Sequence, residues 1–320
     1  MNFLALRRET CAVPGACTIL AIGREASISL ATGVSGRTVF PAGRHAATET
    51  KFLAKILAIS SFVASGHVGL RAIVPALQAL GHETIAIPSV VLSNHYGYPN
   101  VGVSPVTPKD LQEMFWALES NGALRGVEAV LTGYFPSLAH VSAAERLIEE
   151  LKAKNPALIY LCDPVLGDDP GGLYVAGDAA KAIQSGLVPL ADILTPNRFE
   201  LSWLTGDSVE SVEGAHQAMP RLGCPYVAAT SIPGIDGLIA NVYCGKGRPG
   251  QVLARRHENV PHGTGDLFAA LLLGQLLASR EFETACKAAV AGVELVIEAS
   301  LGRAELNLVE TIGQAVGTDK

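Results

Sequence analysis

The sequence predicts an α/β fold of three layers, in which helices cover both faces of a mostly parallel sheet. Three observations predict it. From residue 56 onward, short apolar runs alternate with segments of helical length. Acidic or amide side chains follow directly after several of these runs, where the ligand-binding edge of such a sheet lies. A glycine-rich turn near residue 263 precedes a long apolar run, which is typical of a buried helix that begins at the turn.

The apolar runs are short, rich in branched side chains and bounded by turn residues, as expected of strands buried in a sheet. The predicted strands are Ile56–Ser60, Thr84–Ile87, Ala129–Thr132, Leu158–Cys162, Asp192–Thr195, Tyr226–Thr230 and Leu238–Tyr243.

Segments with a helical pattern lie between most of these strands, and Pro108, Ser142 and Ser211 stand near plausible helix starts. The resulting βαβα order implies parallel strands, whose loops at the carboxyl ends should carry the chemistry. The predicted helices are Val68–Leu80, Lys109–Ser120, Val141–Lys154 and Ser211–Leu222.

Composition marks a boundary near residue 50. Up to Lys51 the chain has six basic and three acidic residues, opposite in sign to the net charge of −6 of the whole chain. We expect residues 1–52 to be a loosely ordered extension, with a targeting segment as the alternative. Residues 53–310 are expected to form one catalytic domain, and residues 311–320 a C-terminal tail.

The whole chain of 320 residues has 24 basic and 30 acidic residues without a Lys/Arg cluster, so we expect no nucleic-acid partner. The apolar stretch Leu267–Ala278 is shorter than the roughly 20 residues that a membrane span needs, so no membrane association is expected. The six cysteines form no C-x-x-C pair, which favours a reducing, cytoplasmic compartment. They are Cys11, Cys17, Cys162, Cys224, Cys244 and Cys286.

The sharpest local motif is Gly263-Thr264-Gly265-Asp266, directly before the apolar run. Two glycines around one threonine allow backbone N–H groups to converge into an anion hole at a helix start. Asp266 could simply complement the helix dipole. We favour a role as a general base that takes a proton from an alcohol while a phosphoryl group arrives.

Two further polar groups follow strands. Asp163 ends one strand, and Pro164 prevents that strand from continuing. Carboxylates without Cys or His neighbours suit a hard cation such as Mg²⁺ beside nucleotide phosphates, and the alternative is an Asp-rich surface turn. Asn197 and Glu200 follow the next strand, where they could equally form a helix-capping box.

The segments Ser60-Ser61 and Leu92–Tyr98 supply hydroxyls, an imidazole and aromatic faces, which suit a small polar ring. A lone histidine such as His95 is more often structural than catalytic.

One formal motif match indicates little, and two common motifs are missing from the sequence. Gly245–Gly250 fits G-x-G-x-x-G but does not open a helix, so we interpret it as a plain turn. A Walker A sequence and a G-x-S-x-G elbow are absent from the sequence, so a nucleotide must be held without a P-loop lysine.

Taken together, these motifs resemble the ribokinase-like superfamily and, within it, the pyridoxal kinases. The resemblance runs from about Leu53 to Leu301. It rests on Ile59-Ser60-Ser61 with Gly66-His67, Ser93-Asn94-His95, Thr132-Gly133-Tyr134, Asp163 to Asp168, Thr195-Pro196-Asn197 with Phe199-Glu200, Thr230-Ser231, and Gly263 to Asp266. It implies a ribokinase-like fold and ATP-dependent phosphorylation of the 5′-hydroxymethyl group of pyridoxal, with pyridoxine and pyridoxamine as further substrates.

The resemblance also implies roles for individual residues. Asp266 would be the catalytic base, and the backbone of Gly263, Thr264 and Gly265 would stabilise the transferring phosphoryl group. The remaining positions divide between two ligands. The vitamer side comprises Ser61, His95, Tyr96 and Tyr134; the nucleotide side comprises Asp163, Tyr174, Asn197, Glu200, Thr230, Ser231, Val260 and Thr264, of which Asp163 and Glu200 would also hold Mg²⁺. A monovalent cation such as K⁺ and a homodimer are further implications.

Three positions depart from the family pattern: Phe62, Leu70 and Tyr96 stand where the family often has His, Asn and Thr. We assign them to the side of the vitamer ring, so they bear on substrate preference. Two alternatives are a hydroxymethylpyrimidine kinase of the same superfamily and a non-catalytic protein that binds B6 vitamers.

Overall fold

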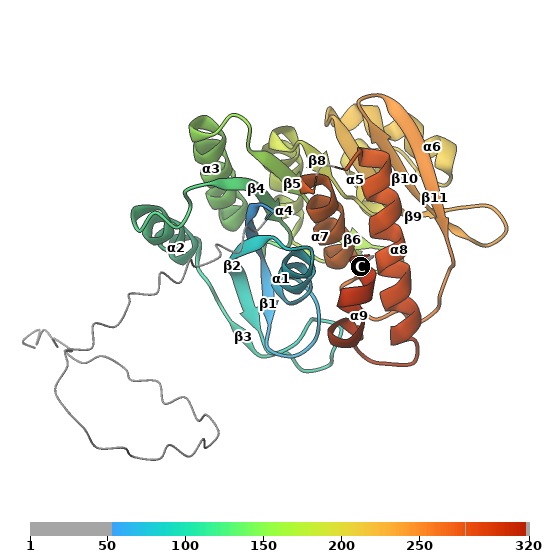
Figure 1. The fold of residues 1–320 in the computed structure, drawn as a ribbon, viewed down its shortest axis with the longest axis horizontal. Coiled ribbons are helices and arrows are strands. Elements are labelled where there is room, and N and C mark those ends of the chain that lie inside the picture. Colours follow the sequence, from blue (N-terminus) through green and yellow to red (C-terminus); the bar gives the residue numbers. More distant parts are fainter. Residues whose placement is uncertain (1–52, 279, 318–320) are drawn as a thin grey trace, which may run out of the picture. The chain divides into compact units, whose positions relative to one another are not determined.

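The computed structural model describes residues 53–278 and 280–317, and Figure 1 shows how their helices and strands are arranged. The main sheet of this part of the chain has nine strands. In spatial order they are β11 (Arg248–Ala254), β10 (Ile239–Gly245), β9 (Tyr226–Pro233), β8 (Ile193–Leu194), β5 (Ile159–Cys162), β4 (Val127–Thr132), β1 (Lys55–Val63), β2 (Glu83–Leu92) and β3 (Val103–Ser104).

The strands from β9 through β2 run parallel, and antiparallel pairs stand at the two edges, β3 against β2 and the β10–β11 hairpin against β9. A separate small hairpin pairs β6 (Gly167–Asp168) with β7 (Gly172–Leu173). The predicted mostly parallel sheet is therefore confirmed.

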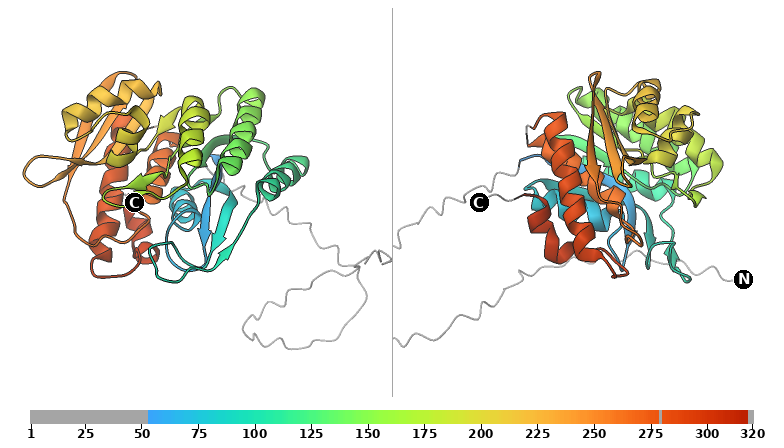
Figure 2. Two further views of the ribbon diagram at one scale, coloured as in Figure 1. Left: turned by 180° about the vertical axis from the view of Figure 1, so that it is seen from behind. Right: turned by 90° about the vertical axis from the view of Figure 1, so that its right-hand side faces the viewer.

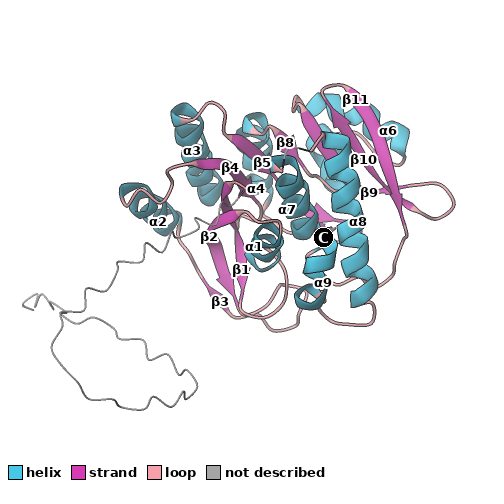
Figure 3. Ribbon diagram, viewed as in Figure 1, coloured by secondary structure: helices cyan, strands magenta, loops and turns pink. Residues whose placement is uncertain are grey.

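Helices cover both faces of the sheet, as Figure 2 shows edge-on and Figure 3 by element type. One face carries α1 (Leu70–Ala79), α7 (Thr264–Leu277), α8 (Phe282–Ser300) and α9 (Leu308–Ala315). The other carries α2 (Pro108–Ser120), α3 (Leu138–Lys154), α4 (Gly177–Ala182), α5 (Arg198–Thr205) and α6 (Val212–Ala218).

Strand β1 shows why the core forms two layers. Its side chains alternate, so that Ile56 and Ala58 pack under α1 and α7 while Leu57 and Ile59 pack on the opposite face. Because both faces are covered, β1 is apolar almost throughout. The three-layer α/β/α arrangement that the sequence predicts is confirmed.

Each predicted strand corresponds to an observed one, and each predicted helix does too, with shifted ends. Helix α3 begins at Leu138, three residues before the predicted start. The Gly245–Gly250 segment is the turn of the β10–β11 hairpin, as predicted. The sequence analysis gave no range for the short strands β3, β6 and β7, for β11, or for the helices α4, α5, α8 and α9.

The expected extension, residues 1–52, lies outside the described residues. The boundary expected at residue 310 falls inside α9, where Thr311 and Ala315 are buried. Helix α9 packs against α8 and α1. The proposed division of the chain remains a prediction.

Candidate active site

The candidate residues lie at the carboxyl edge of the parallel strands. Ser61 belongs to the end of β1, Gly133 follows β4, Asp163 follows β5, and Thr195 follows β8. Backbone hydrogen bonds continue between neighbouring segments beyond the strand ends, from Asp163 N–H to the Thr132 carbonyl at 2.9 Å. These loops therefore form one contiguous edge.

The glycine-rich turn starts helix α7. Gly263 has φ 105°, and a Cβ there would lie 2.0 Å from the backbone oxygen of His67, so only glycine fits. Helix α7 begins at Thr264, and its first N–H groups have no partners within the helix. This is the helix-start geometry at which the sequence predicts anion binding.

Asp266, in the first turn of α7, contacts the ends of β1 and β4. Its carboxylate accepts a hydrogen bond from the backbone N–H of Gly69, and a Cβ built at Gly133 would lie 3.8 Å from its Oδ1. Gly69 has φ 55° and stands so close to Ser61 that a Cβ would lie 2.4 Å from its Oγ. Burial raises the pKa of Asp266 to about 6.

Asp163 is 6% exposed and accepts a hydrogen bond of 2.9 Å from the Thr195 hydroxyl. Burial raises its pKa well above the ordinary value, and the negative charges of Glu200 and Asp266 raise it further. Three carboxylates thus interact electrostatically at one edge of the sheet.

Glu200 is 4% exposed and accepts hydrogen bonds of 2.8 Å from the backbone N–H groups of Leu166 and Asn197. Burial raises its pKa to about 7 against the opposing effect of these N–H donors. Asn197 and Glu200 form a capping box on α5, so this alternative interpretation of the motif is correct in geometry. The Asn197 Nδ2 also donates to the Gly167 carbonyl at 2.8 Å, which ties α5 to β6.

The other nucleotide-side candidates surround this network. The Tyr174 hydroxyl donates to the carboxylate of Asp168, and burial, with this bond next, raises the Tyr174 pKa. Thr230 pairs with Asn197 in a parallel bridge. Ser231 is exposed and has φ 61°.

On the vitamer side, Tyr134 follows β4, and its backbone N–H donates to the Ser60 hydroxyl at 3.2 Å. Burial, then the nearby Tyr96, raises the pKa of Tyr134 to about 12. Tyr96 is 57% exposed. Of the other two family departures, Phe62 is partly buried against the core on the α1 face of the sheet, and Leu70, the first residue of α1, is buried.

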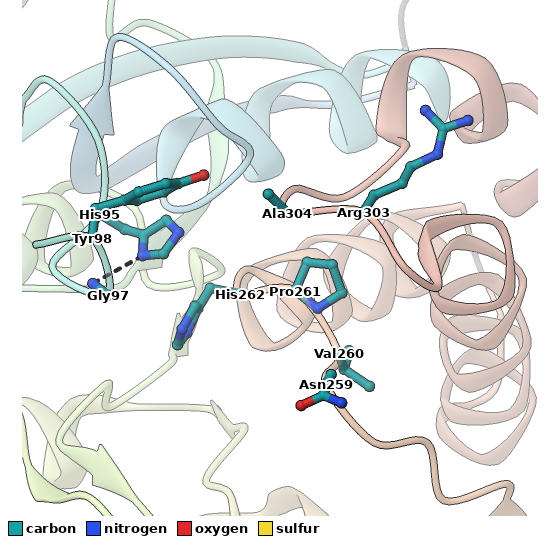
Figure 4. Close-up of a pocket in the computed structure, with 9 residues that line it drawn as sticks. All are labelled: His95, Gly97, Tyr98, Asn259, Val260, Pro261, His262, Arg303 and Ala304. Carbon is teal, nitrogen blue, oxygen red and sulfur yellow. Dashed lines mark hydrogen bonds between the residues drawn. The ribbon is translucent and has the colours of Figure 1, made fainter.

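A cavity of about 280 Å³ lies beside the segment that precedes Gly263 (Figure 4). His95 and Tyr98 line it from the loop after β2, Val260 and His262 line it from the segment before Gly263, and Arg303 lines it from the connection between α8 and α9. The structure thus brings His95 and Val260 to one pocket, although we assigned them to different ligands.

Sequence reasoning missed two residues of this region. Gly69 holds Asp266 through its backbone, and no side-chain pattern signals that contact. Glu305 stands in the loop before α9, and its Oε1 accepts a hydrogen bond of 2.8 Å from the Tyr98 hydroxyl. It lies outside the motifs that carry the resemblance, so their spacing did not indicate it.

Within residues 53–278 and 280–317, no group of three or more His, Cys, Asp and Glu side chains is arranged to hold a metal ion. The donors Asp163 and Glu200 nevertheless fit Mg²⁺, which is usually held by one or two carboxylates together with substrate phosphates. Burial is the largest cause of their raised pKa values, and neighbouring carboxylates raise them further.

Comparison with known proteins identifies the family. A profile of the phosphomethylpyrimidine kinase family matches residues 64–309. The chain is 34% identical to the pyridoxal kinase PdxY of Leifsonia xyli, an alignment that covers 80% of this chain and 94% of that protein. The chain belongs to the pyridoxal kinases of the ribokinase-like superfamily.

Solved structures of pyridoxal kinases share the fold. That of Entamoeba histolytica is 32% identical, with a TM-score of 0.78, and the match covers 83% of this chain and 96% of that one. That of Leishmania donovani, solved with ADP and pyridoxine, is 27% identical with a TM-score of 0.77 and the same coverage. In the described residues, no helix has the length and apolar character that a membrane crossing requires.

Proposed function

We propose that this pyridoxal kinase transfers the γ-phosphoryl group of ATP to the 5′-hydroxymethyl group of pyridoxal, as a step of vitamin B6 salvage, with pyridoxine and pyridoxamine as further substrates. The observation that carries the proposal is the position of Asp266. Its carboxylate stands in the first turn of α7, directly after the glycine-rich turn, where it accepts the backbone N–H of Gly69 and lies beside Gly133 at the end of β4.

Asp266 is suited to act as the general base. With a pKa of about 6 it is mostly ionised at neutral pH, yet basic enough to accept a proton. It takes the proton of the vitamer hydroxyl while that oxygen bonds to the γ-phosphorus and the bond to the ADP oxygen breaks. The backbone N–H groups of Thr264 and Gly265 would stabilise the negative charge on the transferring oxygens, as Gly263 shapes the turn.

The nucleotide would lie over β5, β8 and β9. Asp163 and Glu200 would hold Mg²⁺, which neutralises phosphate charge when it is bound. Asn197, Tyr174, Thr230, Ser231, Val260 and Thr264 would contact the nucleotide. Ser61, His95, Tyr96 and Tyr134 would enclose the vitamer ring on the β1, β2 and β4 side.

Other expectations are part of the same proposal and remain predictions. They are dependence on Mg²⁺, stimulation by a monovalent cation such as K⁺, assembly as a homodimer and a cytoplasmic location. The described residues include Cys162, Cys224, Cys244 and Cys286, all as free thiols, in agreement with a reducing compartment.

The testing experiment is an ATP- and Mg²⁺-dependent assay of pyridoxal phosphate formation, with pyridoxine, pyridoxamine and hydroxymethylpyrimidine as parallel substrates. Turnover of pyridoxal in preference to hydroxymethylpyrimidine supports the proposal. The opposite preference would establish the alternative, a hydroxymethylpyrimidine kinase of the same superfamily. Binding of pyridoxal without turnover would instead indicate a non-catalytic vitamer-binding protein.

A further inference from the structure

Four chain segments meet around the carboxylate of Glu305. It stands between α8 and α9 and reaches the loop after β2, which holds His95 and Tyr98. It also reaches Gly66, after β1, where a Cβ would lie 2.7 Å from its Oε2. The neighbouring Leu306 lies 3.2 Å from the Cβ position of Gly263 in the phosphoryl-binding turn.

The Glu305 carboxylate is held by specific contacts. Oε1 accepts the Tyr98 hydroxyl at 2.8 Å and stands 3.6 Å from His95 Nε2. Oε2 is buried and has no hydrogen-bond partner among the described residues. The Glu305 side chain is 23% exposed and that of His95 is 13% exposed. Burial of a charged group destabilises the folded state unless hydrogen bonds or opposite charges compensate for the lost hydration.

The hydrogen bonds of His95 orient its ring. Its Nδ1 accepts the backbone N–H of Gly97 at 3.1 Å, so in the neutral ring the proton is on Nε2, the nitrogen that faces Glu305. Burial, more than His262, lowers the pKa of His95, which keeps the ring neutral at pH 7. Nδ1 is therefore hydrogen-bonded to Gly97, whereas Nε2 faces Glu305 without a hydrogen-bond partner among the described residues.

The His95 ring packs between the loop after β2 and the segment that precedes the glycine-rich turn of α7. Its centroid lies 4.8 Å from that of Tyr98 and 4.5 Å from that of His262, and Figure 4 shows the His95 ring between the other two. His262 directly precedes Gly263. A displacement of the His95 loop would therefore alter the wall of the pocket beside the phosphoryl-binding turn.

We propose that Glu305 is a positioning residue, which acts through Tyr98 and His95 to fix the loop after β2 against the turn that precedes α7, and so shapes the vitamer side of the pocket. This inference rests on the proposed function for the identity of the ligand. The contact network itself does not depend on it.

The first test compares kinetic constants of Glu305→Ala with those of the wild type. We expect the KM for pyridoxal to rise about tenfold, the effect of losing one hydrogen bond to a charged group, while kcat and the KM for ATP change less than about threefold. Glu305→Gln keeps an acceptor for Tyr98 and should recover most of the loss. Glu310→Ala removes an exposed carboxylate of the same C-terminal region and should leave the KM unchanged.

A double-mutant cycle tests whether Glu305 acts on the KM through its contact with Tyr98. Tyr98→Phe should raise the KM for pyridoxal, and adding it to Glu305→Ala should cause little further increase, because both changes remove the same contact. Additive effects would overturn the proposed route. An unchanged KM in Glu305→Ala, even with a lowered thermal midpoint, would overturn the proposal as a whole.

Hydrogen exchange of the unliganded protein separates this proposal from the proposed function. Backbone amides of residues 93–102 should exchange faster in Glu305→Ala than in the wild type or in Glu310→Ala. If the wild type phosphorylates no vitamer, the proposed function fails, while this measurement still tests Glu305. Equal exchange in all three proteins would refute the positioning role whatever the substrate.

Discussion

The backbone N–H of Gly69 donates a hydrogen bond to the carboxylate of Asp266. The contact links the loop between β1 and α1 to the first turn of α7, two segments almost 200 positions apart in the sequence. It favours the ionised form of the acid, whereas burial favours the protonated form, and burial has the larger effect. The structure thereby keeps a carboxylate near the glycine-rich turn before α7 that can still accept a proton.

The first prediction concerns this carboxylate. Asp266→Asn has nearly the same shape as the wild type but cannot accept the substrate proton, so we expect turnover of pyridoxal to fall by a factor of about 10² to 10⁴. Asp266→Ala should give a loss of the same order. Steady-state kinetics with pyridoxal and ATP measures both, and near-ultraviolet circular dichroism controls for the fold. Undiminished turnover in Asp266→Asn would remove this residue from the role of base.

The second prediction is the acid side of the pH profile. Asp266 works only when it is ionised, and its pKa is raised to about 6, so kcat/KM should fall roughly tenfold per pH unit below pH 6. An unperturbed aspartate would keep activity down to about pH 4. The assay is run from pH 5 to 8 with saturating Mg²⁺, after stability has been verified at each pH. A profile that stays flat down to pH 5 would contradict the raised pKa.

The sequence predicted the layers and most strands because the period and length of apolar runs reflect burial on one or both faces. It also predicted that Asp163 and Asn197 would stand at one edge, since parallel strands end together. Asp266 was assigned to the same site by the resemblance, because its motif opens a helix and does not follow a strand. Helix α8 was missed although its buried residues, among them Phe282, Ala285, Ala289 and Val296, recur at helical spacing. The contacts of Gly69 and Glu305 depend on how distant segments pack, which local patterns do not encode.

The third prediction is that Asp163 lowers the stability of the protein. Its pKa is higher in the folded than in the unfolded chain, so the folded state binds the proton more tightly. Below about pH 4, Asp163 is protonated in both states and does not lower the free energy of unfolding. Above that pH the unfolded chain ionises more readily than the folded protein, so the free energy of unfolding decreases. Asp163→Asn should raise the thermal midpoint at pH 8 in the absence of Mg²⁺ and nucleotide, while catalytic activity falls.

Unfolding experiments at two pH values provide an internal control for Asp163. At pH 4 the wild-type side chain is protonated in the folded state and neutral like Asn, so the two midpoints should converge. A midpoint difference that is equal at pH 4 and pH 8 would show that the amide acts through packing or hydrogen bonding, and the electrostatic explanation would be wrong.

The fourth prediction concerns the shape of the phosphoryl-binding turn. Gly263→Ala places a Cβ at φ 105° and 2.0 Å from the His67 oxygen, so backbone must move in the β1 loop or in the turn. Strain of this kind costs about 1–3 kcal/mol, and we expect the thermal midpoint to fall by several degrees together with turnover. Gly265→Ala is the matched control for stability, since a Cβ there meets no atom within 4 Å. If both variants unfold at the wild-type temperature, a side chain at position 263 does not strain the turn. The requirement for glycine at this position would then come from contact with the ligand alone.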